Sequence, residues 1–116
     1  MLKKKIGTKD FKIKIPERDI QKSVLAYLNH LKKIYFFRSG NGAIRTELGN
    51  FFRTGRPGNP DIVVCYKGIF VGLEIKTKTG KQSPSQEKTE QEIINAGGKY
   101  FIIRSIDDVI NALESL

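Results

Sequence analysis

The chain is poor in residues that several classes of protein require. Its 116 residues include no tryptophan, one cysteine and one histidine. A single cysteine excludes a disulfide framework, and a single histidine leaves no second imidazole to share a metal ion. Cys65 lies in an apolar segment, so we expect a buried structural residue rather than a catalytic thiol. His30 lies away from the apolar stripe of its segment, and we expect it at the surface.

Long apolar runs are missing as well. No stretch approaches the roughly 20 apolar residues that a membrane-spanning helix needs. The basic start, MLKKKIGTKDFKIK, has the charge of a signal peptide, but no apolar stretch follows it. The length is that of one domain, and the cysteine usage fits a cytoplasmic protein.

Negative charge is scarce in the first half of the chain. Residues 1–60 contain 14 Lys and Arg against 4 Asp and Glu, a net charge of +10, whereas residues 61–116 contain 7 against 8, a net charge of −1. A positive field at one end of a protein suits a polyanion, of which nucleic acid is the simplest. The alternative is that the charge serves only solubility.

Two acids lie in a segment that is otherwise almost free of charge. Residues 61–76 read DIVVCYKGIFVGLEIK, two apolar runs joined by Lys67 and Gly68, which is typical of a β-hairpin. With the turn centred on those two residues, Asp61 lies directly opposite Glu74. Directly paired residues point to the same side of the ladder, and Lys76, two residues beyond Glu74, points there too.

Such a cluster is costly without a bound cation. Two unit charges about 5 Å apart repel by about 3 kcal/mol at an effective dielectric near 20. Lys76 offsets part of this repulsion, and a divalent cation with oxygen ligands offsets more. A cation held by two carboxylates beside a lysine is a site for phosphodiester hydrolysis.

The remaining segments predict an α/β fold with a mixed sheet covered by helices on both sides. Pro16 opens a predicted helix over residues 17–33, whose core face is Ile20, Val24, Leu28 and Leu31. Ser83 and Gln86 form a predicted capping box around Pro84, which starts a helix that ends at Gly97. Further predicted elements are strands at 11–15, 34–37 and 100–103 and a last helix after Ser105.

The segment from 39 to 60 is irregular and contains five glycines. Arg45, Arg53 and Arg56 lie in it beside Phe51 and Phe52, a mixture that can contact phosphates and unpaired bases. The alternative is a connector whose two phenylalanines are buried in the core.

Several of these residues together form a known pattern. Gly58-Asn59-Pro60-Asp61, then Glu74-Ile75-Lys76, then Gln86, with Glu17 at the head of the first helix, match G-x-P-D, E-x-K and Q in order. From Pro16 to the C-terminus the chain resembles the virus-type replication-repair nuclease (VRR-NUC) domain, a branch of the PD-(D/E)xK nuclease superfamily. The resemblance implies a restriction-endonuclease-like core over residues 16–116, in the order α-β-β-β-α-β-α, after a basic arm at residues 1–15.

The resemblance also implies roles for the site residues. Asp61, Glu74 and the backbone carbonyl of Ile75 would bind Mg²⁺ or Mn²⁺, and Lys76 would position the attacking water. Glu17 would reach the metal directly or through water, although its place in a first helical turn is equally that of a favourable helix-end charge. Gln86 would reach towards Lys76 or the water, and the capping box explains it as well.

The implied function is metal-dependent cleavage of DNA. Stand-alone members of this type resemble homodimers that cut branched DNA such as Holliday junctions, in a bacterial or phage-infected cell. The alternatives are a nuclease indifferent to branching and a basic DNA-binding protein without catalysis. The residues expected to contact DNA are Lys3, Lys4, Lys5, Arg45, Arg53, Arg56, Lys78 and Lys81.

Overall fold

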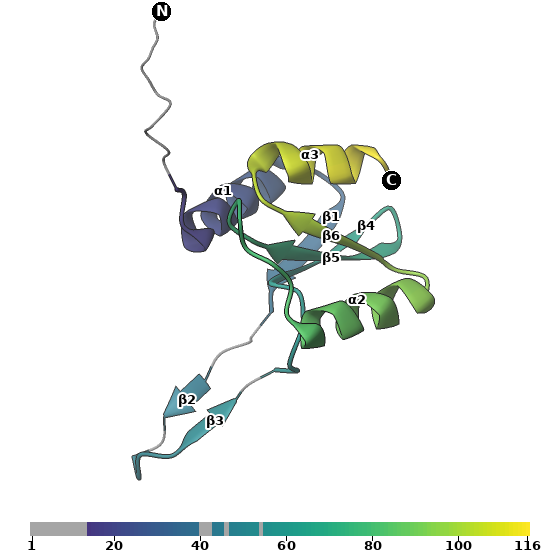
Figure 1. Cartoon of the computed structure of the whole chain (residues 1–116). Coiled ribbons are helices and arrows are strands. Elements are labelled where there is room, and N and C mark those ends of the chain that lie inside the picture. The colour runs from purple at the N-terminus through teal and green to yellow at the C-terminus, as the bar shows by residue number, and fades with distance from the viewer. Residues whose placement is uncertain (1–13, 40–42, 46, 54) are drawn as a thin grey trace, which may run out of the picture.

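The helices and strands alternate along the chain much as the sequence predicts. The computed structural model describes residues 14–39, 43–45, 47–53 and 55–116 (Figure 1). Its elements are α1 (Glu17–His30), β1 (Ile34–Arg38), β2 (Ala43–Arg45), β3 (Phe51–Arg53), β4 (Ile62–Tyr66), β5 (Ile69–Ile75), α2 (Pro84–Asn95), β6 (Lys99–Ile103) and α3 (Ile106–Glu114). None of the helices among these elements is long and apolar enough to cross a membrane.

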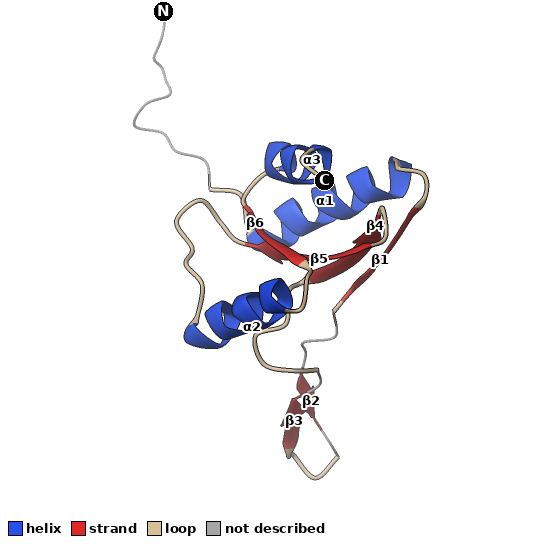
Figure 2. Ribbon diagram, turned by 90° about the vertical axis from the view of Figure 1, so that its right-hand side faces the viewer, coloured by secondary structure: helices blue, strands red, loops and turns tan. Residues whose placement is uncertain are grey.

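The main sheet is mixed, as predicted. Its four strands lie in the order β1-β4-β5-β6, with β4 antiparallel to β1 and β5, and β6 parallel to β5. The parallel pair is joined by a crossover through α2. Figure 2 shows α1 and α3 on one face of the sheet and α2 on the other. Without β2 and β3, the order is the α-β-β-β-α-β-α of a restriction-endonuclease-like core.

The turn between β4 and β5 fixes the register of the hairpin. Lys67 and Gly68 have φ angles of 55° and 76°. A two-residue turn with both φ angles positive is type I′, whose twist matches that of the strands it joins. The pairing runs from Tyr66 opposite Ile69 to Ile62 opposite Leu73. The next pair outward is therefore Asp61 opposite Glu74, which confirms the predicted register.

The apolar core lies between the sheet and the layer formed by α1 and α3. Helix α1 contributes Ile20, Val24 and Leu28 to it, as predicted, and Leu31 packs at its edge. The helix ends at His30, three residues earlier than predicted, because Leu31 already has extended backbone angles. His30 is exposed, as expected. The side chains buried to 0 % exposure are Val24, Leu28, Ile62, Val64, Val71, Leu73, Ile103 and Val109.

The opposite face of the sheet is only partly covered. On this face helix α2 packs against β6, whereas β1 and β4 have no helix over them (Figure 2). Tyr35 is therefore 68 % exposed and Phe37 48 % exposed. Cys65 lies on this face and is exposed, so the prediction that it is buried is wrong. Strand alternation places Cys65 on the α2 face, and that face has no cover at this strand.

Both ends of α2 are capped as the sequence predicts. Ser83 accepts a hydrogen bond from the backbone N–H of Gln86, whose side chain accepts one from the N–H of Ser83. At the other end Gly97 has a φ of 97°, and the N–H of Gly98 donates to the carbonyl oxygen of Ile93 at 2.9 Å. This is a Schellman motif, which satisfies the last carbonyls of the helix.

The irregular segment contains two short strands that the sequence does not predict. β2 and β3 pair as an antiparallel two-stranded sheet, with Ala43 opposite Arg53 and Arg45 opposite Phe51. Figure 1 shows this hairpin standing away from the four-stranded sheet. Three-residue strands between glycines leave too short a pattern to recognise. The predicted strand at residues 11–15 falls almost wholly outside the described part of the chain.

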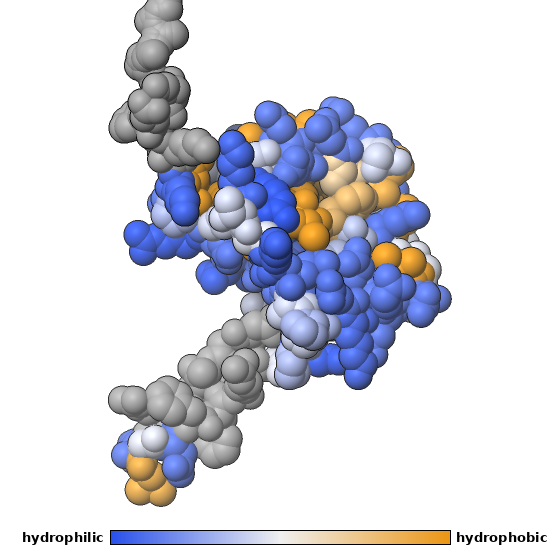
Figure 3. All heavy atoms as spheres, in the orientation of Figure 1, coloured by the Kyte–Doolittle hydropathy of each residue, from blue (hydrophilic) through white to orange (hydrophobic). Residues whose placement is uncertain are grey.

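The face of the molecule that Figure 3 shows is largely polar. Figure 3 shows hydrophilic residues over most of the visible face, with smaller apolar patches between them. This agrees with a charged content of 28 %.

Candidate active site

The hairpin brings Asp61 and Glu74 to neighbouring positions at its open end. The backbone N–H of Ile75 donates to Oδ2 of Asp61 at 2.7 Å, so this carboxylate reaches across to β5. Glu74 lies inside β5 and is only 2 % exposed. Leu73 and Ile75, its neighbours in the strand, point into the core, so Glu74 points to the α2 face.

The carboxylate of Glu74 is held from three sides. The side-chain amide of Gln86 donates from Nε2 to Oε2 at 2.7 Å, and the hydroxyl of Tyr100 donates to Oε1 at 3.4 Å. Nζ of Lys76 lies 3.9 Å from Oε2, and the side chain of Lys76 is 13 % exposed. Asp61, Lys76 and Gln86, all predicted from the sequence, therefore surround Glu74.

Burial dominates the electrostatics of this cluster. Burial, the largest cause, and the nearby Asp61 carboxylate together raise the pKa of the Glu74 carboxyl from 4.5 to about 8, and Lys76 acts in the opposite direction. Burial likewise raises the pKa of Tyr100, so its hydroxyl remains a hydrogen-bond donor. A cation at the cluster would stabilise the ionised form of Glu74.

Gln86 serves the helix cap and the acid pair with different atoms. Its amide oxygen accepts from the N–H of Ser83 at 2.8 Å, and its amide nitrogen donates to Glu74. The capping box therefore fixes which way the amide faces. The two readings of Gln86 from the sequence, cap and site residue, are compatible in this geometry.

Pro60 is held in place by two glycines. A β-carbon on Gly72 would lie 2.9 Å from Cγ of Pro60, so only glycine at this position of β5 leaves space for the proline ring. Gly58 has a φ of 84° and lies against the backbone of Ser85 at the start of α2. These contacts seat the Gly-x-Pro-Asp segment between the sheet and α2, which places Asp61 at the head of β4.

The loop after Lys76 is braced by Arg104. Its Nη1 donates to the carbonyl oxygens of Thr77 at 2.6 Å, Gly80 at 2.8 Å and Lys78 at 3.3 Å. The backbone N–H of Lys76 donates to the carbonyl oxygen of Ile103 at 3.0 Å, which continues the pairing of β5 with β6. The backbone on both sides of the Lys76 side chain is therefore fixed.

The sequence predicts no site role for two of these supporting residues. It places Tyr100 at the start of a strand, and Arg104 lies outside every predicted element. The parallel register, with Glu74 beside Ile102, places Tyr100 next to Gly72. A buried tyrosine needs a hydrogen-bond partner for its hydroxyl. This requirement is the one signal in the sequence that points to Tyr100 as a residue near the site.

Other predicted residues lie apart from the cluster or outside the described side chains. Glu17 is exposed in the first turn of α1. Across the residues that the structure describes, no three His, Cys, Asp or Glu side chains are grouped to hold a metal ion, so Glu17 does not form a triad with Asp61 and Glu74. Arg56 forms an ion pair with Glu92 at 2.7 Å. Lys78 and Lys81 are exposed in the loop after Lys76, and nothing is described of the side chains of Lys3, Lys4, Lys5, Arg45 and Arg53.

The donor set at the cluster fits a hard divalent cation. Asp61, Glu74 and the carbonyl of Ile75 offer only oxygen, which Mg²⁺ and Mn²⁺ prefer. A carboxylate has about four lone-pair sites, and the hydrogen bonds described above use fewer than that on each acid. Acceptor capacity therefore remains for a metal ion.

The order of strands and helices defines the fold class of the chain. A mixed four-stranded sheet between helices, in the order α-β-β-β-α-β-α once β2 and β3 are set aside, is a restriction-endonuclease-like core. A solved structure named "VRR_NUC domain" is similar to this chain, with a TM-score of 0.62 and 22 % sequence identity over 84 % of this chain and 94 % of that one. The chain therefore has the VRR-NUC fold. No family model and no curated protein matches the sequence.

Proposed function

We propose that the chain is a Mg²⁺- or Mn²⁺-dependent endodeoxyribonuclease. The observation that carries the proposal is the buried Glu74, which lies opposite Asp61 and is contacted by Lys76 and Gln86. A buried acid next to a second acid is a poor way to stabilise this end of the hairpin, because an apolar pair would stabilise it better. The VRR-NUC fold supports the same conclusion.

Asp61, Glu74 and the carbonyl of Ile75 would hold the metal ion, with Glu17 as a further candidate through water. When bound, the ion would polarise the scissile phosphate and lower the pKa of a water molecule. Lys76 would orient that water or stabilise the charge that develops on the phosphate. Gln86 and Tyr100 keep the Glu74 carboxylate in one orientation, which limits the rearrangement needed for the reaction.

The substrate in this proposal is structured or branched DNA. The net charge of +10 in residues 1–60 supplies an electrostatic attraction for phosphates. Resolution of a Holliday junction would follow from a homodimer, because a two-fold axis relates two sites that can make paired incisions. A nuclease indifferent to branching is the alternative within the same chemistry.

The test is cleavage of a labelled four-way junction, a flap and a plain duplex with Mg²⁺ or Mn²⁺. We expect Asp61→Asn and Lys76→Ala to lose at least about a hundredfold in rate, on the scale of a lost electrostatic contact to the transition state. Glu87→Gln, an exposed acid in the first turn of α2, is the matched control and should cut normally. Equal cleavage by wild type and Asp61→Asn would refute the proposal.

The basic composition favours a second candidate, a DNA-binding protein that does no chemistry. Such a protein would bind DNA equally well in chelator, take up no divalent ion in calorimetry and yield no product. Metal-dependent product that disappears in Asp61→Asn would exclude this candidate.

A further inference from the structure

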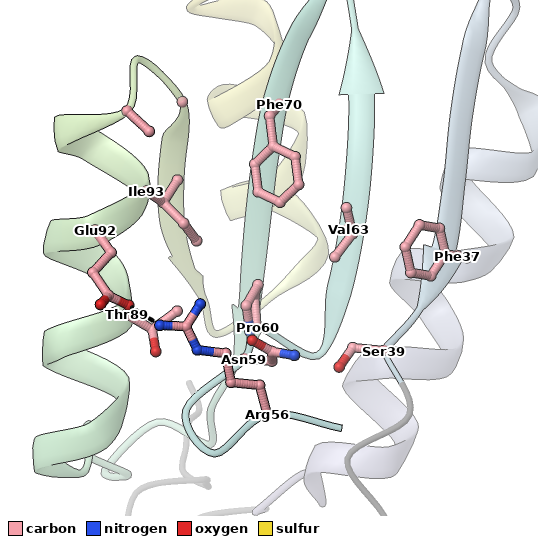
Figure 4. Close-up of a pocket in the computed structure, with 12 residues that line it drawn as sticks. Phe37, Ser39, Arg56, Asn59, Pro60, Val63, Phe70, Thr89, Glu92 and Ile93 are labelled. Carbon is pink, nitrogen blue, oxygen red and sulfur yellow. Dashed lines mark hydrogen bonds and ion pairs between the residues drawn. The ribbon is translucent and has the colours of Figure 1, made fainter. Parts of the chain in front are cut away.

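A groove lies on the sheet face beside the acid pair. It has a volume of about 560 Å³, which is within the range of small-ligand sites. Figure 4 shows Phe37, Val63 and Phe70 in a row on its floor, one from each of three strands, and Ile93 of α2 on its wall. The loop that carries Arg56 closes one end.

The groove combines flat apolar surface with one unsatisfied polar atom. Phe37 and Phe70 are 48 % and 46 % exposed, so much of each ring is accessible. The hydroxyl of Ser39 also lines the groove; it is buried and has no hydrogen-bond partner within the described residues. Arg56 and Glu92 pair at the rim, which neutralises the acid there. This arrangement suits a planar ligand with π faces and a polar edge.

The groove is connected to the acid pair by the backbone. The N–H of Ser39 donates to the carbonyl oxygen of Asp61 at 2.8 Å, and Pro60, which precedes Asp61, lines the groove. Phe70 and Glu74 lie on the same face of β5, four residues apart, which is about 13 Å. That length corresponds to roughly four steps of a stacked DNA strand.

We propose that this groove binds an unpaired base of the DNA substrate, close to the phosphodiester that is cut. The proposal rests on the proposed function, because it takes the acid pair as the place of cleavage. Aromatic side chains stack on bases of any sequence, and unpaired bases occur where branched DNA departs from duplex. Net charge favours this occupant over a second copy of the chain, because a chain with a net charge of +9 attracts a polyanion and repels an equally charged copy.

The test is binding of two duplexes in chelator, one with a single unpaired thymine and one with an abasic residue at that position. We expect wild type to bind the unpaired base from a few-fold to about a hundredfold more tightly, the range for stacking on an aromatic ring. The double variant Phe37→Ala/Phe70→Ala should bring this ratio to about one. Ile15→Ala removes an exposed apolar side chain that does not line the groove and should leave the ratio unchanged.

The outcomes separate this proposal from the proposed function. The proposed base site is refuted if wild type binds the unpaired-thymine duplex and the abasic duplex equally well, or if the double variant keeps the wild-type preference. Either result counts against the base site even if the protein cuts DNA. Because the assay contains no metal, a protein that never cuts can still show the ratio. The solution mass gives a further test. If wild type is a dimer and the double variant is a monomer, the groove is an interface between copies, and the proposal is refuted.

Discussion

The buried carboxyl of Glu74 should make the stability of the metal-free protein fall as pH rises. In the unfolded chain this carboxyl ionises near its ordinary pKa of 4.5, whereas burial and the neighbouring Asp61 raise its pKa to about 8 in the folded protein. Between these values the folded state binds more protons than the unfolded state, so the free energy of unfolding decreases with pH. The loss is complete only above pH 8.

The size of the effect follows from the same pKa. One pKa unit corresponds to about 1.36 kcal/mol, so a rise from 4.5 to about 8 implies a loss on the order of 5 kcal/mol. Glu74 is 2 % exposed, so its carboxyl is removed from bulk water when the chain folds. A small domain has a total stability of about 5–15 kcal/mol, and the loss should therefore be easy to measure.

The assay is urea unfolding in chelator, followed by circular dichroism from about pH 5 to about pH 9. Glu74→Gln removes the titration and keeps an acceptor for Gln86, so its profile should lack this slope and it should be more stable than wild type at the alkaline end. Glu114→Gln, an exposed acid at the end of α3, is the control and should retain the wild-type slope. A flat wild-type profile, or an equal slope in Glu74→Gln, would refute the reasoning.

Three further predictions concern the support of the site and the basic arm. Gly72→Ala should destabilise the fold by about 1–3 kcal/mol in urea unfolding, because its β-carbon would meet Pro60; an unchanged midpoint would contradict this. Arg104→Ala leaves three carbonyl oxygens of the loop after Lys76 without their donor, and we expect faster proteolysis of that loop; equal digestion rates would show that the brace is dispensable. Deletion of residues 1–15 should flatten the salt dependence of DNA affinity, because about six lysines are lost, whereas an unchanged slope would assign the arm another role.

The parts of the site that depend on local rules could be predicted from the sequence. The Lys67-Gly68 turn determines the hairpin register, and the register places Asp61 opposite Glu74. The capping box around Ser83 places Gln86 in the first turn of α2. Each of these inferences spans a few residues, where backbone geometry leaves few alternatives.

The features that depend on packing between distant segments could not be predicted. Cys65 belongs to an apolar strand, and only the position of α2 over β6 rather than β4 explains its exposure. Arg104 acts on carbonyl oxygens more than 20 residues away along the chain. Strands β2 and β3 have three residues each, which is too short for a periodic sequence pattern to predict their pairing.

The two hydrogen bonds of the Gln86 side chain, one to the helix cap and one to Glu74, restrict which residue type can occupy position 86. Glutamate closes a capping box as well as glutamine does. Here, however, a glutamate would aim a third negative charge at Oε2 of Glu74, where the amide nitrogen now donates at 2.7 Å. Alanine would leave both the N–H of Ser83 and the buried acid without a partner. Only a side chain that accepts at one terminal atom and donates at the other meets both demands, so the start of a helix and the orientation of a buried acid depend on a single amide.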